Sequence, residues 1–121
     1  MKPDYSPHSA AVAAHVARCR SLTVAEIERL AGEDEWSAEH ARALTEASRA
    51  VGRRVEFLVW DLTWDLVWDA AQRDDLPAHV VGRAASIAAD AAVALAARDL
   101  ISPEQFDLLY GPWAAVMGPP R

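Results

Sequence analysis

Apolar residues recur at helical spacing along this chain, and no segment alternates apolar and polar residues as a half-buried strand would. Alanine supplies much of the 52% apolar fraction, and alanine has the highest helix propensity but gives a sheet little surface to bury. A chain of 121 residues is long enough to bury one core without disulfides or a structural metal. We therefore expect an all-α protein: a compact bundle of five or six helices over residues 9–118, between a flexible lead-in at 1–8 and a tail at 119–121.

Start and stop signals divide the chain into helices. Thr23 and Glu26 form a T-x-x-E capping box, and Gly32 stands where a left-handed cap would close the helix that follows. Ser102 and Pro103 give the clearest helix start, with an N-cap serine and a proline at the first helical position. The predicted helices cover residues 9–20, 24–31, 53–73, 78–100 and 103–110. A further helix is capped by Ser37 and carries an apolar stripe to Val51, and Gly52 either ends it or lies inside a longer helix.

Two further expectations concern the second half of the chain. The helix over 78–100 is predicted to have a narrow inner face, made of Val80, Ala84, Ile87, Ala91 and Leu95. The pair Gly111-Pro112 is predicted to end the last helix, so that Trp113, Val116 and Met117 dock as a separate final turn.

The most unusual stretch is a four-residue repeat of the form W-D-L-x over residues 60–69. At about 100° per residue, Trp60, Trp64 and Trp68 fan across roughly 80° of a helix, with Phe57 inside the fan. An aliphatic face lies nearly opposite, made of Val55, Val59, Leu62 and Leu66. Because both faces need cover, we expect this helix to be central in the bundle, with Tyr110 and Trp113 packed onto it.

Asp61, Asp65 and Asp69 lie between those two faces. An acidic row on a helix is usually its solvated side or is paired with arginines from other helices. The three carboxylates spread along about 12 Å of helix axis, too far for all to reach one cation. We expect no metal and no cofactor here.

The leading hypothesis is a non-catalytic interaction module that presents the tryptophan face to a protein or peptide partner, or to a second copy in a homodimer. The candidate binding residues are Phe57, Trp60, Asp61, Trp64, Asp65 and Trp68. One alternative is a small helical enzyme or accessory factor with a tryptophan-lined pocket and Asp or His as acid-base groups. No glycine-rich phosphate loop, G-x-S-x-G, H-E-x-x-H or C-x-x-C motif supports catalysis, and no catalytic residue is assigned.

A second alternative is a degenerate helix-turn-helix regulator, because residues 23–44 place a short helix, a glycine and a second helix in succession. Glu28 and Glu33 occupy positions where that motif has a small and an apolar residue. The net charge of −6 also repels phosphate backbones and anionic lipid heads. Nucleic-acid and membrane-surface binding are therefore not expected.

The histidines and the single cysteine have ordinary explanations. His15 and Cys19 are spaced i and i+4, as two zinc ligands can be, but a histidine and a lone cysteine beside valines are more often core residues. His40 falls on an apolar stripe, and His79 begins a polar helix face with Arg83 and Asp90. One cysteine excludes an intrachain disulfide, and no signal peptide or membrane span is evident, so a cytoplasmic protein is expected.

Three pieces of the second half carry a resemblance: the Trp-Asp repeat, the run A-A-V-A-L-A-A-R-D-L-I at 91–101 and the ending F-D-L-L-Y-G-P-W at 106–113. Together they resemble alanine-rich helical proteins of unassigned function from actinobacteria and their phages. The resemblance implies an all-helical fold and brings no active site with it.

Overall fold

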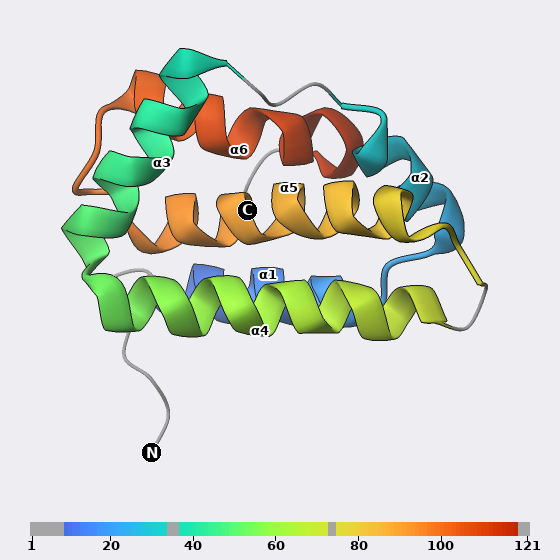
Figure 1. Ribbon diagram of the computed structural model, residues 1–121. Coiled ribbons are helices and arrows are strands. Elements are labelled where there is room, and N and C mark those ends of the chain that lie inside the picture. Colours follow the sequence, from blue (N-terminus) through green and yellow to red (C-terminus); the bar gives the residue numbers. More distant parts are fainter. Residues whose placement is uncertain (1–8, 34–36, 73–74, 119–121) are drawn as a thin grey trace.

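The computed structural model describes residues 9–33, 37–72 and 75–118, and within α4 it does not describe the side chains of Arg53, Glu56 and Phe57. The predicted lead-in at 1–8 and tail at 119–121 therefore lie outside the described residues. Those residues form a compact all-α bundle with no strand among them, which confirms the predicted fold class (Figure 1). Its six helices are α1 (Ser9–Arg20), α2 (Val24–Ala31), α3 (Ala38–Val51), α4 (Arg53–Ala71), α5 (Ala78–Ala96) and α6 (Pro103–Met117).

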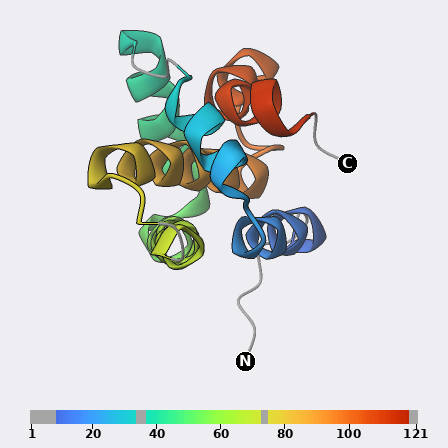
Figure 2. The same ribbon diagram turned by 90° about the vertical axis from the view of Figure 1, so that its right-hand side faces the viewer.

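The central helix is α5, and the prediction that the Trp-Asp helix would be central is wrong. All five other helices contact α5, which is buried on every side from Ile87 to Ala96 rather than along a narrow inner face (Figures 1 and 2). Alanine explains this arrangement, because a helix with so little side-chain bulk can be approached closely from all directions.

Helices α4 and α1 lie side by side along one side of α5, while α3 and α6 lie on the other (Figure 2). The core-facing stripe of α4 is made of small and β-branched residues one turn apart: Val59, Thr63, Val67 and Ala71. Thr63 satisfies its buried hydroxyl by donating to the Val59 carbonyl oxygen at 2.7 Å. A stripe of this kind suits close contact with the alanines of α5.

Helix α6 corrects two expectations. It continues through Gly111 and Pro112 to Met117 instead of ending there, although an internal proline removes one backbone hydrogen bond. Burial of Trp113 stabilises the continued helix. Trp113 and Tyr110 do not pack onto α4, since α6 contacts α5, α3 and α2, and the Trp113 ring meets His15 of α1 at 4.4 Å between ring centroids.

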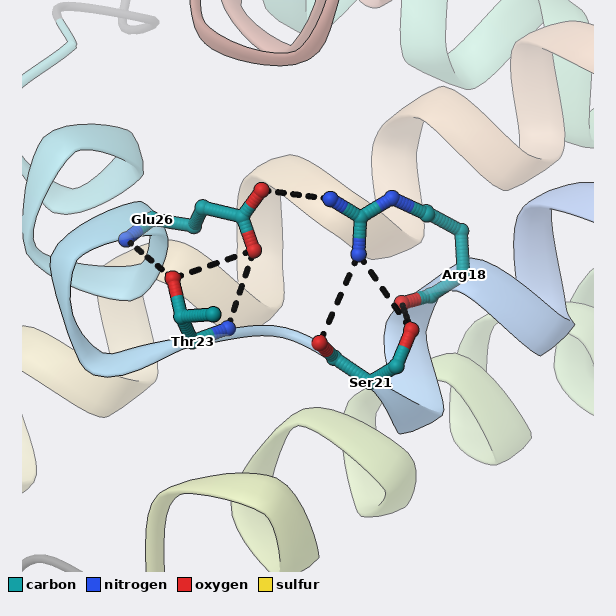
Figure 3. A network of polar contacts seen from close by, with 4 residues as sticks. All are labelled: Arg18, Ser21, Thr23 and Glu26. Atoms are coloured by element: carbon teal, nitrogen blue, oxygen red, sulfur yellow. Dashed lines mark hydrogen bonds and ion pairs between the residues drawn. The ribbon is translucent and has the colours of Figure 1, made fainter.

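The joint between α1 and α2 contains the predicted capping box. The Thr23 hydroxyl accepts from the Glu26 amide at 3.2 Å, and the Glu26 carboxylate accepts from the Thr23 amide at 2.9 Å (Figure 3). Arg18 of α1 donates to the same carboxylate and to Ser21, which ties the two helices together (Figure 3). Burial raises the pKa of Glu26, but the contacts from Thr23 and Arg18 outweigh it, so the pKa lies below its usual value.

Two glycines behave differently at helix ends. Gly32 has φ −80°, in the right-handed region, so the predicted left-handed cap is wrong; its amide satisfies the last carbonyls of α2 without reversing φ. Gly52 has φ +88°, between α3 and α4, a conformation that a residue with a Cβ rarely adopts. Gly52 therefore ends α3 and lets the chain turn directly into α4.

Among the described residues, α5 is the one helix long and apolar enough to cross a bilayer by length and composition. A core helix meets the same criteria, and 67% of this apolar window is buried by the rest of the bundle. The apolar character of α5 is thus explained by its central position.

Candidate functional site

The structure brings the three tryptophans of the repeat together along the seam between α4 and α5. Trp60 and Trp64 stack with ring centroids 4.9 Å apart, and Trp68 follows at 6.3 Å from Trp64. Trp64 lies over Gly82 of α5, within 3.9 Å of where a Cβ would stand. All three are half-buried and pack against the core. The fan therefore covers α5 with its inner edge and meets solvent with its outer edge.

A buried polar cluster beneath this fan was missed by the sequence reasoning. Asp90 is only 3% exposed, although it was placed on a polar face with Arg83. Its carboxylate accepts from the Trp60 indole N–H at 3.4 Å and lies 3.5 Å from His40 Nε2. The cluster joins α3, α4 and α5 inside the bundle. The sequence does contain a signal for the burial of Asp90: its neighbours are a run of alanines, so this stretch of the helix has no polar face toward solvent.

The Trp68 indole N–H is buried, and within the described part of the chain it has no hydrogen-bond partner. Part of its ring is nonetheless exposed, so this side chain stands where the fan meets solvent. An unmade hydrogen bond costs about 1–3 kcal/mol. Apolar contact with Trp64 and the core offsets that cost.

The predicted aliphatic face of α4 is not one surface. Val59 is in the core, at 1% exposure, whereas Leu62 is 42% exposed, and Leu58, which the sequence reasoning did not select, is 43% exposed. The reason is that the core-facing stripe runs between the tryptophans and the leucines instead of through either. Leu58 and Leu62 therefore lie on the outer side of the helix, and the partly buried Val55 and Leu66 flank them.

The aspartates of the repeat share that outer side. Asp61, Asp65 and Asp69 are exposed, and their carboxylates form no ion pair with any described residue. Arg54 is the exposed cation of α4 among the described side chains. The outer side of α4 is consequently both apolar and acidic.

His15 and Cys19 are core residues rather than a pair of surface ligands. His15 Nε2 lies 2.8 Å from the Ala88 carbonyl oxygen, and burial lowers its pKa to about 4 despite that hydrogen bond. Burial raises the pKa of the Cys19 thiol to about 12, against the opposing effect of Arg18. A neutral imidazole and a protonated thiol suit the interior.

Two other residues singled out in the sequence add nothing to this surface. His79 is exposed at the start of α5, and the side chain of Phe57 lies outside the described residues.

The helix-turn-helix alternative lacks the short connection of that motif. Residues 32–37 separate α2 from α3, whereas such motifs use three or four residues. His40, near the start of α3, is buried in the core. The side chains at the start of a recognition helix must instead be exposed to reach DNA.

The fold and this surface together define a class: an all-helical bundle with an outer helix that faces the core with small and β-branched residues, flanked by half-buried tryptophans on one side and by exposed leucines and aspartates on the other. No family model matches the chain, and neither the curated proteins nor the solved structures include one with significant similarity to it.

Proposed function

We propose that this protein is a non-catalytic interaction module and that α4 is the helix through which it binds another protein. The observation that carries the proposal is the exposure of Leu58 and Leu62, both above 40%, side by side on the outer side of α4. Leucines one turn apart on an outer helix form a ridge that a partner can cover. Because both side chains are already more than half buried, covering the remainder would contribute about 2 kcal/mol to binding.

The tryptophan fan supports the same proposal in a modified form. Trp60, Trp64 and Trp68 hold α4 against α5 and contribute their outer edges to the neighbouring surface. Binding then depends first on the leucines, with the aromatic rings at the margin. His40 and Asp90, the acid-base pair that a tryptophan-lined enzyme pocket would use, are buried in the bundle, which favours a structural role for them.

Affinity capture from the native cell with a tagged chain tests the proposal. The double variant Leu58→Gln/Leu62→Gln removes the ridge, and Leu108→Gln removes an exposed leucine of α6 (37% exposed) as the matched control. We expect one protein to be retained by wild type and by Leu108→Gln and lost by the double variant. The proposal is wrong if the captured proteins are the same for all three chains, or if nothing is captured by any of them.

A further inference from the structure

Charge and apolar surface are interleaved on the outer side of α4. At about 100° per residue, a residue seven positions along a helix returns to within about 20° of the first. Asp65 therefore lies nearly in line with Leu58, and Asp69 nearly in line with Leu62. Asp61 stands between the two leucines in sequence and is exposed like the others. A partner that covers the leucine ridge must meet these carboxylates at its edges.

The charge of this surface restricts what can cover it. Three exposed carboxylates face one exposed cation, Arg54, among the described side chains of α4. The whole chain carries a net charge of −6. A partner that places its own acidic groups here meets repulsion, whereas basic groups gain attraction and faster association.

The shape of the surface favours a helix as the partner. Two leucines at i and i+4 form a short ridge along the helix axis, which fits the groove between side-chain rows of a second helix. Resting on the proposed function, we infer that the ligand of α4 is a basic amphipathic helix of another protein. It carries apolar residues at i, i+3 and i+4 for the ridge of Leu58 and Leu62, and Lys or Arg for the carboxylates of Asp61 and Asp65.

A second copy of this chain is the competing occupant. Two-fold pairing through the same leucines brings the same surface of both copies together. Each copy carries a net charge of −6 and presents three exposed carboxylates beside the ridge against one described cation of α4, Arg54, so charge disfavours the pairing of two copies. The charge pattern therefore selects a basic partner over self-pairing.

Two synthetic helices of about 18 residues, or about five turns, provide the probe. Both carry leucine at i, i+3, i+4 and i+7; one has lysine at the remaining positions and the other has glutamate. Each is titrated into the full chain by calorimetry, with circular dichroism to verify that every variant is folded. The variants are Leu58→Gln/Leu62→Gln, Asp61→Asn/Asp65→Asn and the control Leu108→Gln.

We expect the lysine helix to bind wild type and Leu108→Gln alike. Its affinity should fall about tenfold or more without the two leucines, because their burial is lost. It should fall about fivefold without the two carboxylates, and added salt should weaken it further. The glutamate helix should not bind.

Several results would overturn the inference. Equal binding of the lysine and glutamate helices would show that charge does not select the partner. Unchanged binding to Leu58→Gln/Leu62→Gln would show that the two leucines are not the contact. Light scattering that shows a dimer, abolished by Leu58→Gln/Leu62→Gln, would make a second copy the occupant. A partner captured through these leucines but indifferent to the lysine helix leaves the proposed function standing and rejects the basic-helix assignment.

Discussion

At the scale of single residues, the interior of this bundle holds polar side chains in their neutral or mutually paired forms. His15 is neutral beside the Ala88 carbonyl oxygen, and Cys19 is a protonated thiol. Asp90 is buried but has Trp60 and His40 beside it. Each arrangement avoids leaving an uncompensated charge in a region of low dielectric.

The first prediction concerns His15 and pH. Its pKa in the folded protein, about 4, lies below the ordinary value of 6.5, so the unfolded chain takes up the proton first as pH falls. The associated stability is complete above pH 6.5 and is lost as pH falls toward 4. Between pH 7 and pH 5 the free energy of unfolding should fall by about 2 kcal/mol from this group.

Urea unfolding of wild type and His15→Gln at the two pH values measures the effect. Other groups, including Glu26, contribute equally to both chains, so the difference between the two slopes isolates His15. The variant should lose less stability than wild type over this interval. Parallel slopes would contradict a buried neutral histidine.

The second prediction concerns the buried cluster. Asp90→Ala should lower the free energy of unfolding by about 3 kcal/mol, because it removes a carboxylate that three helices enclose. Trp60→Phe removes one hydrogen-bond donor to it and should cost about 1 kcal/mol. The exposed Asp61→Ala serves as the control, with a cost below about 0.5 kcal/mol. If chemical denaturation gives equal losses for Asp90→Ala and Asp61→Ala, Asp90 is not structural.

At the scale of the elements, the starts of the capped helices could be predicted from the sequence, but the end of α6 and the places of the helices in the bundle could not. Capping boxes at Thr23 and Ser102 involve residues three positions apart, so their hydrogen bonds are local and the sequence predicts them. The path of α6 through Pro112 depends instead on burial of Trp113 against distant parts of the chain. Local signals cannot show when tertiary packing outweighs a helix breaker.

The same limit explains the missed features of α4 and α5. Periodicity identified two apolar flanks on α4, but it did not reveal that a stripe at the inner border of both, with Val59 and Val67, is the part that is fully buried. Periodicity predicts a narrow inner face for α5, whereas its small residues allow five helices to surround it. Charged residues usually lie in solvent, which predicts an exposed Asp90, but the structure buries it.

The third prediction belongs to the joint between α3 and α4. Gly52→Ala should destabilise the protein by about 1–2 kcal/mol, because a Cβ is strained at φ +88° even with open space around it. Gly32→Ala is the matched control, since its φ of −80° is ordinary and a Cβ there would be 3.4 Å from the nearest atom, the Arg29 carbonyl oxygen. Thermal unfolding of the two variants compares them. Equal losses would mean that the positive φ at Gly52 carries no cost.

At the scale of the whole molecule, size and composition were enough to predict the fold class, but they did not indicate which surface binds a partner. An alanine-rich chain with six helix starts and no strand pattern has few compact arrangements besides a bundle. Which side of α4 is left uncovered depends on how the other five helices are arranged around α5. The sequence predicts a binding surface made of the tryptophan face with Asp61 and Asp65, and the arrangement of the helices adds the exposed Leu58 and Leu62 to it.

The central claim is that this side of α4 is free in the isolated protein and covered in the cell. The buried thiol of Cys19 makes a direct measurement possible, because Asp69→Cys, on the same side of α4 but outside the residues assigned to the partner, then supplies the accessible cysteine of the chain. Thiol labelling is followed for Asp69→Cys and for the control Leu108→Cys, in purified protein and in intact cells. We expect both cysteines to react rapidly when purified and Asp69→Cys alone to be protected in cells; slow labelling of purified Asp69→Cys, or equal labelling of both in cells, would contradict the account.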